Sequence, residues 1–192
     1  MKAEFLKKQT SEMNRIFKIW IFIFGIFFIL FISVYKYYCI RFERNLNAEG
    51  LTDYISEINK SKELPNNFYS AYEMINPKST ENNLIHSIFQ KSECQSLKVS
   101  GRISNIVKKQ QLNRRENLIF GYFLTKKIEK NTTQKQCLTW TANQFDFLYN
   151  IKGIENASEF YFRKKIRNLD ADQLLTLIRM MENPVKNNPL RK

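Results

Sequence analysis

The longest apolar run of the chain lies close to its N-terminus. Between Ile19 and Tyr35 the sequence carries no charged residue and consists almost entirely of Ile, Phe, Leu and Val. This length is at the lower edge for crossing the hydrocarbon layer of a membrane, and Lys18 and Lys36 extend it by reaching the two interfaces. We predict a transmembrane helix over residues 19–38.

Aromatic residues and the absence of a cleavage signal favour a retained helix. Trp20, Tyr35, Tyr37 and Tyr38 occupy the positions where aromatic belts lie. A cleaved signal peptide is the alternative, but the run is long and bulky and no small-x-small site follows it. Cys39 follows tyrosines rather than small residues, which disfavours a lipoprotein anchor.

Basic residues flank the apolar run unequally. Five precede it and three follow it, namely Lys2, Lys7, Lys8, Arg15 and Lys18 before, and Lys36, Arg41 and Arg44 after. Because basic residues tend to stay on the cytoplasmic side, residues 1–18 are expected to form a cytoplasmic basic tail. The rest of the chain would then lie in the periplasm, anchored by a single pass through the cytoplasmic (inner) membrane.

Helical periodicity continues after the apolar run. Residues 39–63 are expected to form a juxtamembrane helix and linker, with one amphipathic helix from Leu51 to Lys60. A second helix opens at Leu64 and Pro65 and begins the main domain, residues 64–192. The two apolar faces are Leu51, Tyr54, Ile55 and Ile58, then Phe68, Ala71, Tyr72 and Ile75. From Lys78 to Lys109 the sequence is polar and predicts no clear element.

The remaining sequence also favours helices. Apolar residues are dense enough for a buried helix from Leu118 to Ile128, and Asn131 or Thr132 can cap the next helix. Another helix is expected after Gly153, and the last begins near Asp170 and stops at Pro184. The inward positions are Leu138, Ala142, Ile154, Ala157, Phe160, Tyr161, Leu174, Leu175, Leu177, Ile178 and Met181. The fold class is therefore mostly α.

The chain has 192 residues and a formal net charge of +13. This balance suits nucleic acid, anionic lipid head groups or pyrophosphate-bearing substrates, and a biased genome composition would also produce it. No nucleic-acid-binding motif occurs beside the membrane anchor, so we expect no nucleic-acid partner. The length allows one domain of ordinary core size plus an accessory segment.

Few residues suggest metal or nucleophilic chemistry. Cys94 and Cys137 would lie in the outer domain, where an oxidising compartment lets them form a disulfide if they are close together. His86, the single histidine, has no paired ligand spacing and is expected to be a surface or capping residue. No zinc spacing, phosphate loop or serine-hydrolase motif occurs, so we expect no metal and no cofactor.

Between Cys137 and Pro189 the chain carries small, aromatic and amide residues at fixed spacings. These are Leu138, Asn143, Gly153, Ala157, Tyr161, Phe162, Lys164, Leu169, Leu177, Pro184, Asn188 and Pro189. The pattern resembles, without gaps, the C-terminal half of the transglycosylase domain of penicillin-binding proteins, the family-51 peptidoglycan glycosyltransferases. The chain departs from that family at Thr139, where the family has Glu, and at Leu148 and Arg163, where it has Gly.

The resemblance implies a lysozyme-like all-α domain over residues 64–192. Because the chain stops at Lys192, before a further helix that the family usually has, we expect this domain to be truncated at its C-terminus.

The resemblance also implies where catalytic carboxylates should lie. The family's catalytic base falls on Asn76, and an amide cannot remove a proton from an attacking hydroxyl. The second carboxylate falls on Gly121 without gaps, or on Glu116 if residues are inserted before Cys137. Glu129 matches the acidic residue that ends the same helix and is expected to be an ordinary surface charge.

Residues for holding a pyrophosphate donor are implied as well. Ser100 and Lys108 coincide with the ends of the family's Ser-Thr-Ile-Thr-Gln-Gln-Leu-x-Lys segment, and Lys164 with its Tyr-Phe-Gly-Lys. Arg114 and Arg115 stand for its Arg-Lys pair, although a solvated helix face explains them equally well. We take these five residues as substrate-binding candidates.

Three functions remain open from the sequence. The first is a degenerate transglycosylase that has lost catalysis and binds cell-wall glycan, lipid-linked precursor or protein partners of the envelope. The second is an active, divergent monofunctional transglycosylase using Glu73, Glu81 or Glu116, which needs two carboxylates converging on one cleft. The third is a structural subunit of a secretion, motility or division machine. We favour the first, and hence a protein that is not an enzyme.

Overall fold

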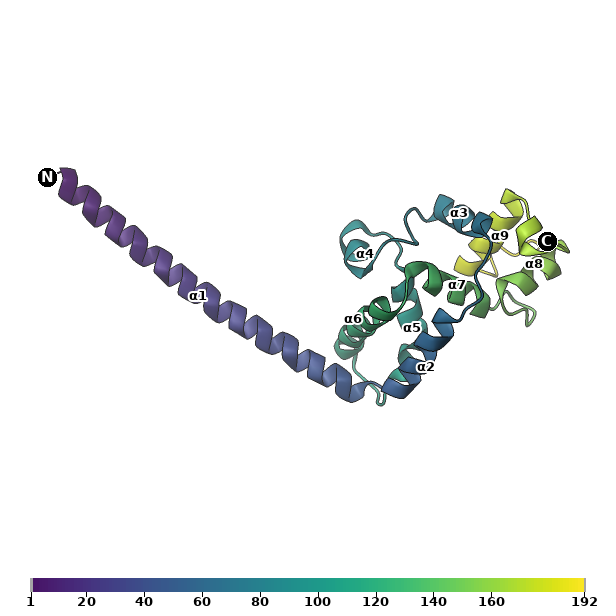
Figure 1. Ribbon diagram of the computed structural model, residues 1–192, viewed down its shortest axis with the longest axis horizontal. Coiled ribbons are helices and arrows are strands. Elements are labelled where there is room, and N and C mark those ends of the chain that lie inside the picture. Colours follow the sequence, from purple (N-terminus) through teal and green to yellow (C-terminus); the bar gives the residue numbers. More distant parts are fainter. Residues whose placement is uncertain (1, 192) are drawn as a thin grey trace. The chain divides into compact units, whose positions relative to one another are not determined.

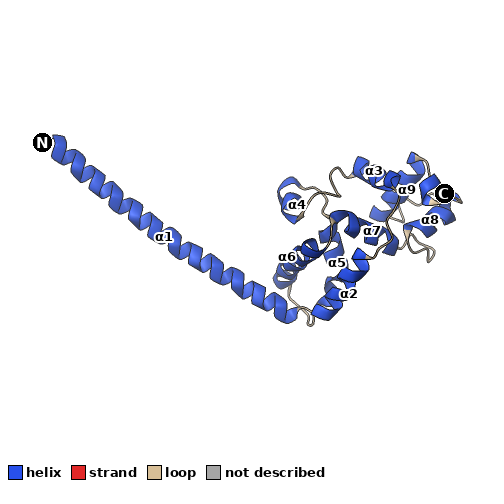
Figure 2. Cartoon of the chain, in the orientation of Figure 1, coloured by secondary structure: helices blue, strands red, loops and turns tan. Residues whose placement is uncertain are grey.

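A computed structural model describes residues 2–191 of the chain, and the side chains of residues 17–191. Helices account for all regular structure in these residues, and no β-strand occurs among them (Figure 2). The expectation of a mostly α protein is confirmed. The chain divides into two compact units, residues 1–44 and residues 45–192.

The first unit consists of helix α1, Lys2–Asn45. Within it, Phe17–Asn45 is long and apolar enough to cross a membrane, a property shared by membrane spans and signal sequences. The sequence predicted a span of residues 19–38 followed by a juxtamembrane helix and linker, and α1 continues without a break to Asn45. Neither Gly nor Pro occurs between Cys39 and Asn45, so nothing there breaks the helix.

The second unit follows with shorter helices (Figure 1). They are α2 (Ala48–Asn59), α3 (Asn66–Ile75), α4 (Leu84–Gln90), α5 (Gln95–Val107), α6 (Arg114–Asn131), α7 (Gln134–Gln144), α8 (Ile154–Phe162), the 3-10 helix η1 (Ile166–Asn168) and α9 (Ala171–Glu182). The predicted amphipathic helix is α2, and the helix predicted after Pro65 is α3. The polar stretch without a prediction forms α4 and α5.

Capping residues define several helix starts. Asp170 accepts from the backbone N–H of Gln173 and begins α9 as predicted. The predicted cap at Asn131 or Thr132 is wrong, because α6 continues to Asn131 and Thr133 caps α7 instead. Gln136 explains the difference, since its side chain accepts from the Thr133 backbone N–H while Thr133 accepts from that of Gln136.

The main core lies where α3, α7, α8 and α9 meet. It comprises Leu64, Phe68, Tyr69, Ala71, Tyr72, Leu138, Ala142, Phe147, Ile154, Ala157, Ile166, Leu169, Leu174, Leu177, Ile178 and Met180. Most of the predicted inward positions belong to it or pack against it. Phe160 does not, because it is exposed and packs on Tyr149. Helix α6 is buried on one face only, since Leu118 at its predicted apolar start is exposed.

A tight turn connects α7 to α8 around Gly153. Asp146 and Lys152 form an isolated antiparallel bridge, and the Gly153 backbone N–H donates to the Phe145 carbonyl over 2.8 Å. Gly153 has a φ of +85°, and a Cβ there would lie 2.8 Å from the Asn143 carbonyl oxygen. Only glycine fits this conformation without moving the α7 backbone.

We therefore predict that Gly153→Ala destabilises the helical unit by about 1–3 kcal/mol. Gly101 is the matched control, because a Cβ at this helical position has nothing within 4 Å; Gly101→Ala should be neutral or stabilising by up to about 1 kcal/mol. Urea unfolding of the detergent-solubilised chain, followed by tryptophan fluorescence, measures both. Equal midpoints for the two variants would contradict the prediction.

Candidate functional site

Two of the three carboxylates considered for catalysis accept a local hydrogen bond. Glu73 in α3 accepts a hydrogen bond from the Thr80 hydroxyl. Glu116 in the first turn of α6 accepts from the Asn113 backbone N–H over 3.1 Å and completes a capping box. Glu81 lies exposed in the turn before α4. None of the three lines the grooves described below.

The two positions assigned to the family's carboxylates hold no ionisable group. Asn76 ends α3, and its side-chain Nδ2 is buried without a hydrogen-bond partner. Gly121 lies within α6, where its carbonyl accepts from the Thr125 hydroxyl over 2.8 Å, and a Cβ there would have nothing within 4 Å. The space beside Gly121 is therefore open.

The substrate-binding candidates are only partly brought together. Ser100 is buried, and its hydroxyl donates to the Leu97 carbonyl and accepts from Thr125, so it cannot reach a ligand. Lys108, which ends α5 and donates to Asn117 over 3.2 Å, lies at the junction with α6, where Arg114 and Arg115 are exposed. Lys164 lies elsewhere, between α8 and α9, and donates to Gln173 over 3.2 Å.

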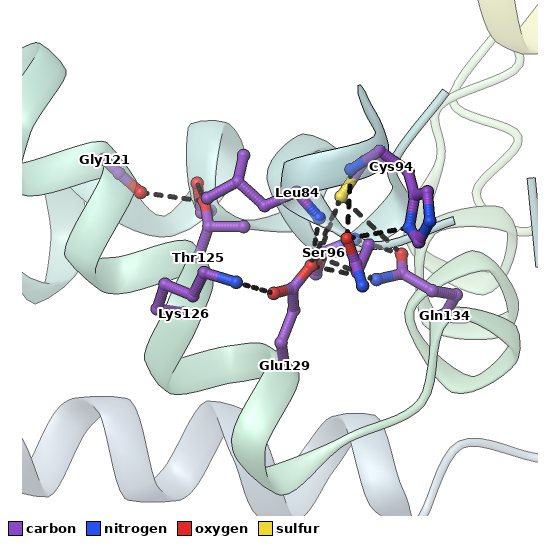
Figure 3. A network of polar contacts seen from close by, with 11 residues as sticks. Leu84, Cys94, Ser96, Gly121, Thr125, Lys126, Glu129 and Gln134 are labelled. Carbon is purple, nitrogen blue, oxygen red and sulfur yellow. Dashed lines mark hydrogen bonds and ion pairs between the residues drawn. The ribbon is translucent and has the colours of Figure 1, made fainter. Parts of the chain in front are cut away.

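Glu129 is not the ordinary surface charge that the sequence suggested. Its side chain is only 12% exposed. It accepts from the Leu84 backbone N–H (2.6 Å), the Ser96 hydroxyl (3.1 Å), the Gln134 amide (3.3 Å) and the Lys126 ammonium (3.2 Å), as Figure 3 shows. This Glu129 network joins α4, α5, α6 and α7 and uses the carboxylate for structure.

Both cysteines of the second unit are buried free thiols, so the disulfide considered from the sequence is not formed in the structure. Cys94 contacts the Ser96 hydroxyl at 3.0 Å and Cys137 contacts the Thr132 hydroxyl at 3.3 Å. Burial raises the pKa of Cys94 and raises the pKa of Cys137 from 9.0 to about 11. Protonated Cys137 therefore stabilises the fold below pH 9.0, and this contribution is lost as the pH rises toward about 11.

The long groove lies between the α2–α3 loop and the α8–η1 segment. One part, of about 630 Å³, is lined by Lys62, Glu63, Leu64, Pro65, Glu155, Glu159, Lys165, Ile166 and Arg167. A smaller part, of about 220 Å³, shares Lys62, Leu64 and Glu155 and adds Asn143, Lys152, Gly153 and Asn156. An ion pair between Lys62 and Glu155, 3.2 Å long, lies where the two parts join.

Three carboxylates that sequence reasoning missed face this long groove. Glu155 and Glu159 are one turn apart on α8, and Glu63 comes from the opposite wall. Their one sequence signal is the four-residue spacing on α8, which is also typical of a solvated helix face. The convergence depends on contacts such as Lys62 with Glu155, which are 93 residues apart.

The walls of the long groove suit an elongated polar ligand. Leu64 and Ile166 are buried and form an apolar part of the lining, whereas Lys165 and Arg167 supply positive charge. Amides from Asn143 and Asn156 extend the polar lining. Glu155 is paired with Lys62, and Glu63 lies 3.6 Å from the Lys135 ammonium, so two of the three carboxylates already have cationic partners.

Comparison with known proteins agrees with the resemblance in the sequence. The Transglycosylase family model matches residues 103–192, from the middle of α5 to the C-terminus. The matched segment contains Gly121, Thr139 and the Gly153 turn, while α2, α3, α4 and Asn76 precede it. No curated protein matches the chain.

Removal of the Glu129 carboxylate should unfold the junction of four helices. Glu129→Ala leaves the Leu84 N–H, Ser96 and Gln134 without an acceptor, and we expect a loss of about 3 kcal/mol. Glu81→Ala, at an exposed carboxylate, should change stability by less than about 0.5 kcal/mol. Urea midpoints of the two variants decide the matter, and similar values would refute a structural role for Glu129.

The two buried thiols should resist alkylation in the folded protein. In a Cys39→Ser background at pH 8, iodoacetamide should modify neither Cys94 nor Cys137, because burial keeps both protonated and covered. In denaturant without reductant, mass spectrometry should find two adducts. Denatured protein that gains them only after reduction would reveal a disulfide and overturn the assignment.

Proposed function

Because residues 103–192 match the Transglycosylase family model, we propose that the chain is a membrane-anchored, transglycosylase-like domain that binds cell-wall glycan or its lipid-linked precursor without polymerising it. The anchor is the apolar part of α1, Phe17–Asn45. The excess of basic residues before it supports a cytoplasmic N-terminus and a periplasmic helical unit.

The proposed loss of catalysis rests on the residues that occupy the two expected carboxylate positions. The amide of Asn76 and the hydrogen of Gly121 stand where carboxylates are expected, and neither accepts a proton. Glu73 and Glu116, the nearest acidic residues along the chain, are engaged with Thr80 and with the cap of α6. Loss of a general base alone slows such a reaction by about two to four orders of magnitude.

The long groove supports retained binding. Its size is within the range of small-ligand sites, and its lining combines charged and amide side chains with the apolar Leu64 and Ile166. A glycan or a pyrophosphate-linked precursor presents hydroxyls, amides and negative charge, which Lys165, Arg167 and Asn156 can bind. Ionic contacts of this kind at a solvated wall are individually weak, so several must act together.

A divergent active enzyme is the second candidate. It is favoured by the convergence of Glu63, Glu155 and Glu159 on one groove, because acid–base glycosyl transfer needs carboxylates around a common cleft. Glu63 and Glu155 are paired with lysines, whereas Glu159 has no ion pair among the described residues and would be the base.

A docking role in an envelope protein complex is the third candidate. Helix α4 presents Ile85, Ile88 and Phe89 to solvent, and Phe89 is 83% exposed. A contiguous apolar face on a short helix is typical of a contact surface.

The proposal predicts binding without turnover. Full-length protein in detergent micelles, mixed with fluorescent lipid-linked disaccharide precursor, should change the anisotropy of the label but form no polymer on a gel. Lys165→Gln and Arg167→Gln should each weaken binding about 3–10-fold, since each removes one charge contact, whereas the exposed Lys130→Gln should not.

Three results would go against this proposal. Steady polymer formation abolished by Glu116→Gln or by Glu159→Gln would establish an enzyme. Absence of precursor and glycan binding in folded protein would remove the binding function. Binding unaffected by Lys165→Gln and Arg167→Gln would exclude the long groove.

A further inference from the structure

A second hollow lies where α3, α5, α7 and α9 come together. It measures about 370 Å³ and is lined by Tyr72, Lys98, Arg102, Thr141, Met181 and Glu182. We call it the α3–α9 pocket. It shares no lining residue with the long groove, and its volume lies at the small end of the range for small-molecule sites.

An unpartnered hydroxyl marks the wall of this pocket. Thr141 is 3% exposed, yet its Oγ1 makes no hydrogen bond in the part of the chain that the structure describes. The fully buried Gln95 donates to the hydroxyl of Tyr72, another lining residue of the pocket, but leaves its own Oε1 without a partner. Such buried groups are normally satisfied by protein, water or a ligand.

The wall formed by α3 and α5 is internally neutralised. The Lys98 ammonium donates to Glu93 over 2.6 Å and to the Tyr72 hydroxyl over 3.2 Å. The Tyr72 hydroxyl in turn donates to Glu93 over 2.9 Å. Burial and the nearby Glu93 raise the pKa of Tyr72 well above its ordinary value, so it stays a phenol. This wall therefore presents polar atoms but little net charge.

The remaining two charges of the pocket are opposite and unpaired. Arg102 from α5 packs its guanidinium over the Phe145 ring at 5.4 Å, and Glu182 is the last residue of α9. Among the described residues neither side chain makes a hydrogen bond or an ion pair, although both line the same hollow. The structure thus holds a cation and a carboxylate apart across a small space.

This charge arrangement selects a class of ligand. A simple anion would meet the Glu182 carboxylate, and a simple cation would meet the Arg102 guanidinium. A molecule that carries both charges satisfies both, because guanidinium pairs well with carboxylate and a carboxylate pairs well with ammonium. The Met181 thioether and the Tyr72 ring offer an apolar surface for the side chain of such a molecule.

We propose that the α3–α9 pocket binds a small zwitterion, a free amino acid or a dipeptide, with its carboxylate on Arg102 and its ammonium on Glu182. The Thr141 hydroxyl donates to or accepts from the bound backbone. The proposal uses residues outside the long groove and does not depend on the function proposed above.

Single-charge analogues give the sharpest test. Full-length protein in detergent is titrated by calorimetry with alanine and with alanyl-alanine, and then with N-acetylalanine and alanine amide, each of which lacks one charge. At least one zwitterion should bind, and both analogues should bind at least about 10-fold more weakly, which corresponds to about 1.4 kcal/mol. Comparison of the two zwitterions identifies the preferred length.

Variants locate the binding to this pocket. Arg102→Gln and Glu182→Gln should each weaken binding at least about 10-fold, Arg102→Lys should retain part of it, and Lys130→Gln and Glu49→Gln, at exposed positions, should not change it. Thr141→Val should weaken binding while leaving the free protein at least as stable, because it removes an unpaired buried hydroxyl. That opposite pair of effects would not arise from a structural defect.

The proposal fails on any of three results. One is the absence of heat with both zwitterions at 10 mM, about the weakest affinity that such a site would have, in protein whose circular dichroism is native. Another is equal binding of the blocked analogues. The last is unchanged affinity in both Arg102→Gln and Glu182→Gln, which would place the ligand elsewhere.

Discussion

The carboxylate of Glu129 is the point on which the arrangement of α4, α5 and α7 depends. Leu84 is the first residue of α4, Ser96 the second of α5 and Gln134 the first of α7, so three helix N-termini face one negative charge. Helix N-termini carry partial positive charge, and a mostly buried carboxylate needs donors. The helix N-termini gain an acceptor, and the buried carboxylate gains donors. This exchange helps to order α4 and the first turns of α5 and α7 beside the main core.

The sequence predicts elements where one local signal dominates. The apolar run of α1, the start of α3 after Pro65 and the Asp170 cap of α9 follow from neighbouring residues. Helices α4 and α5 were not foreseen, because their residues are mostly polar and the distant Glu129 contributes to their order, although α5 also buries Val99, Ile103 and Val107. The sequence also did not predict the long groove or the α3–α9 pocket, because their walls combine residues that are far apart in the chain. Lys62 and Glu155 are an example, since only the fold brings them together.

The proposed binding residues and the expected catalytic positions are of different kinds. The grooves are made by charges at helix ends and loops, for example Lys165, Arg167 and Glu182, which can change without disturbing the core. The resemblance places the catalytic carboxylates within or at the end of helices, at Gly121 and Asn76. Under the proposed function, binding can therefore persist without the carboxylates that catalysis would need.

The open space beside Gly121 bears on which residues this position of α6 can hold. A Cβ at Gly121 would have no heavy atom within 4 Å outside its own helix backbone and chain neighbours. Packing therefore does not oppose the first atom of a side chain at this position. The residue at this position is therefore not dictated by a lack of room for a first side-chain atom.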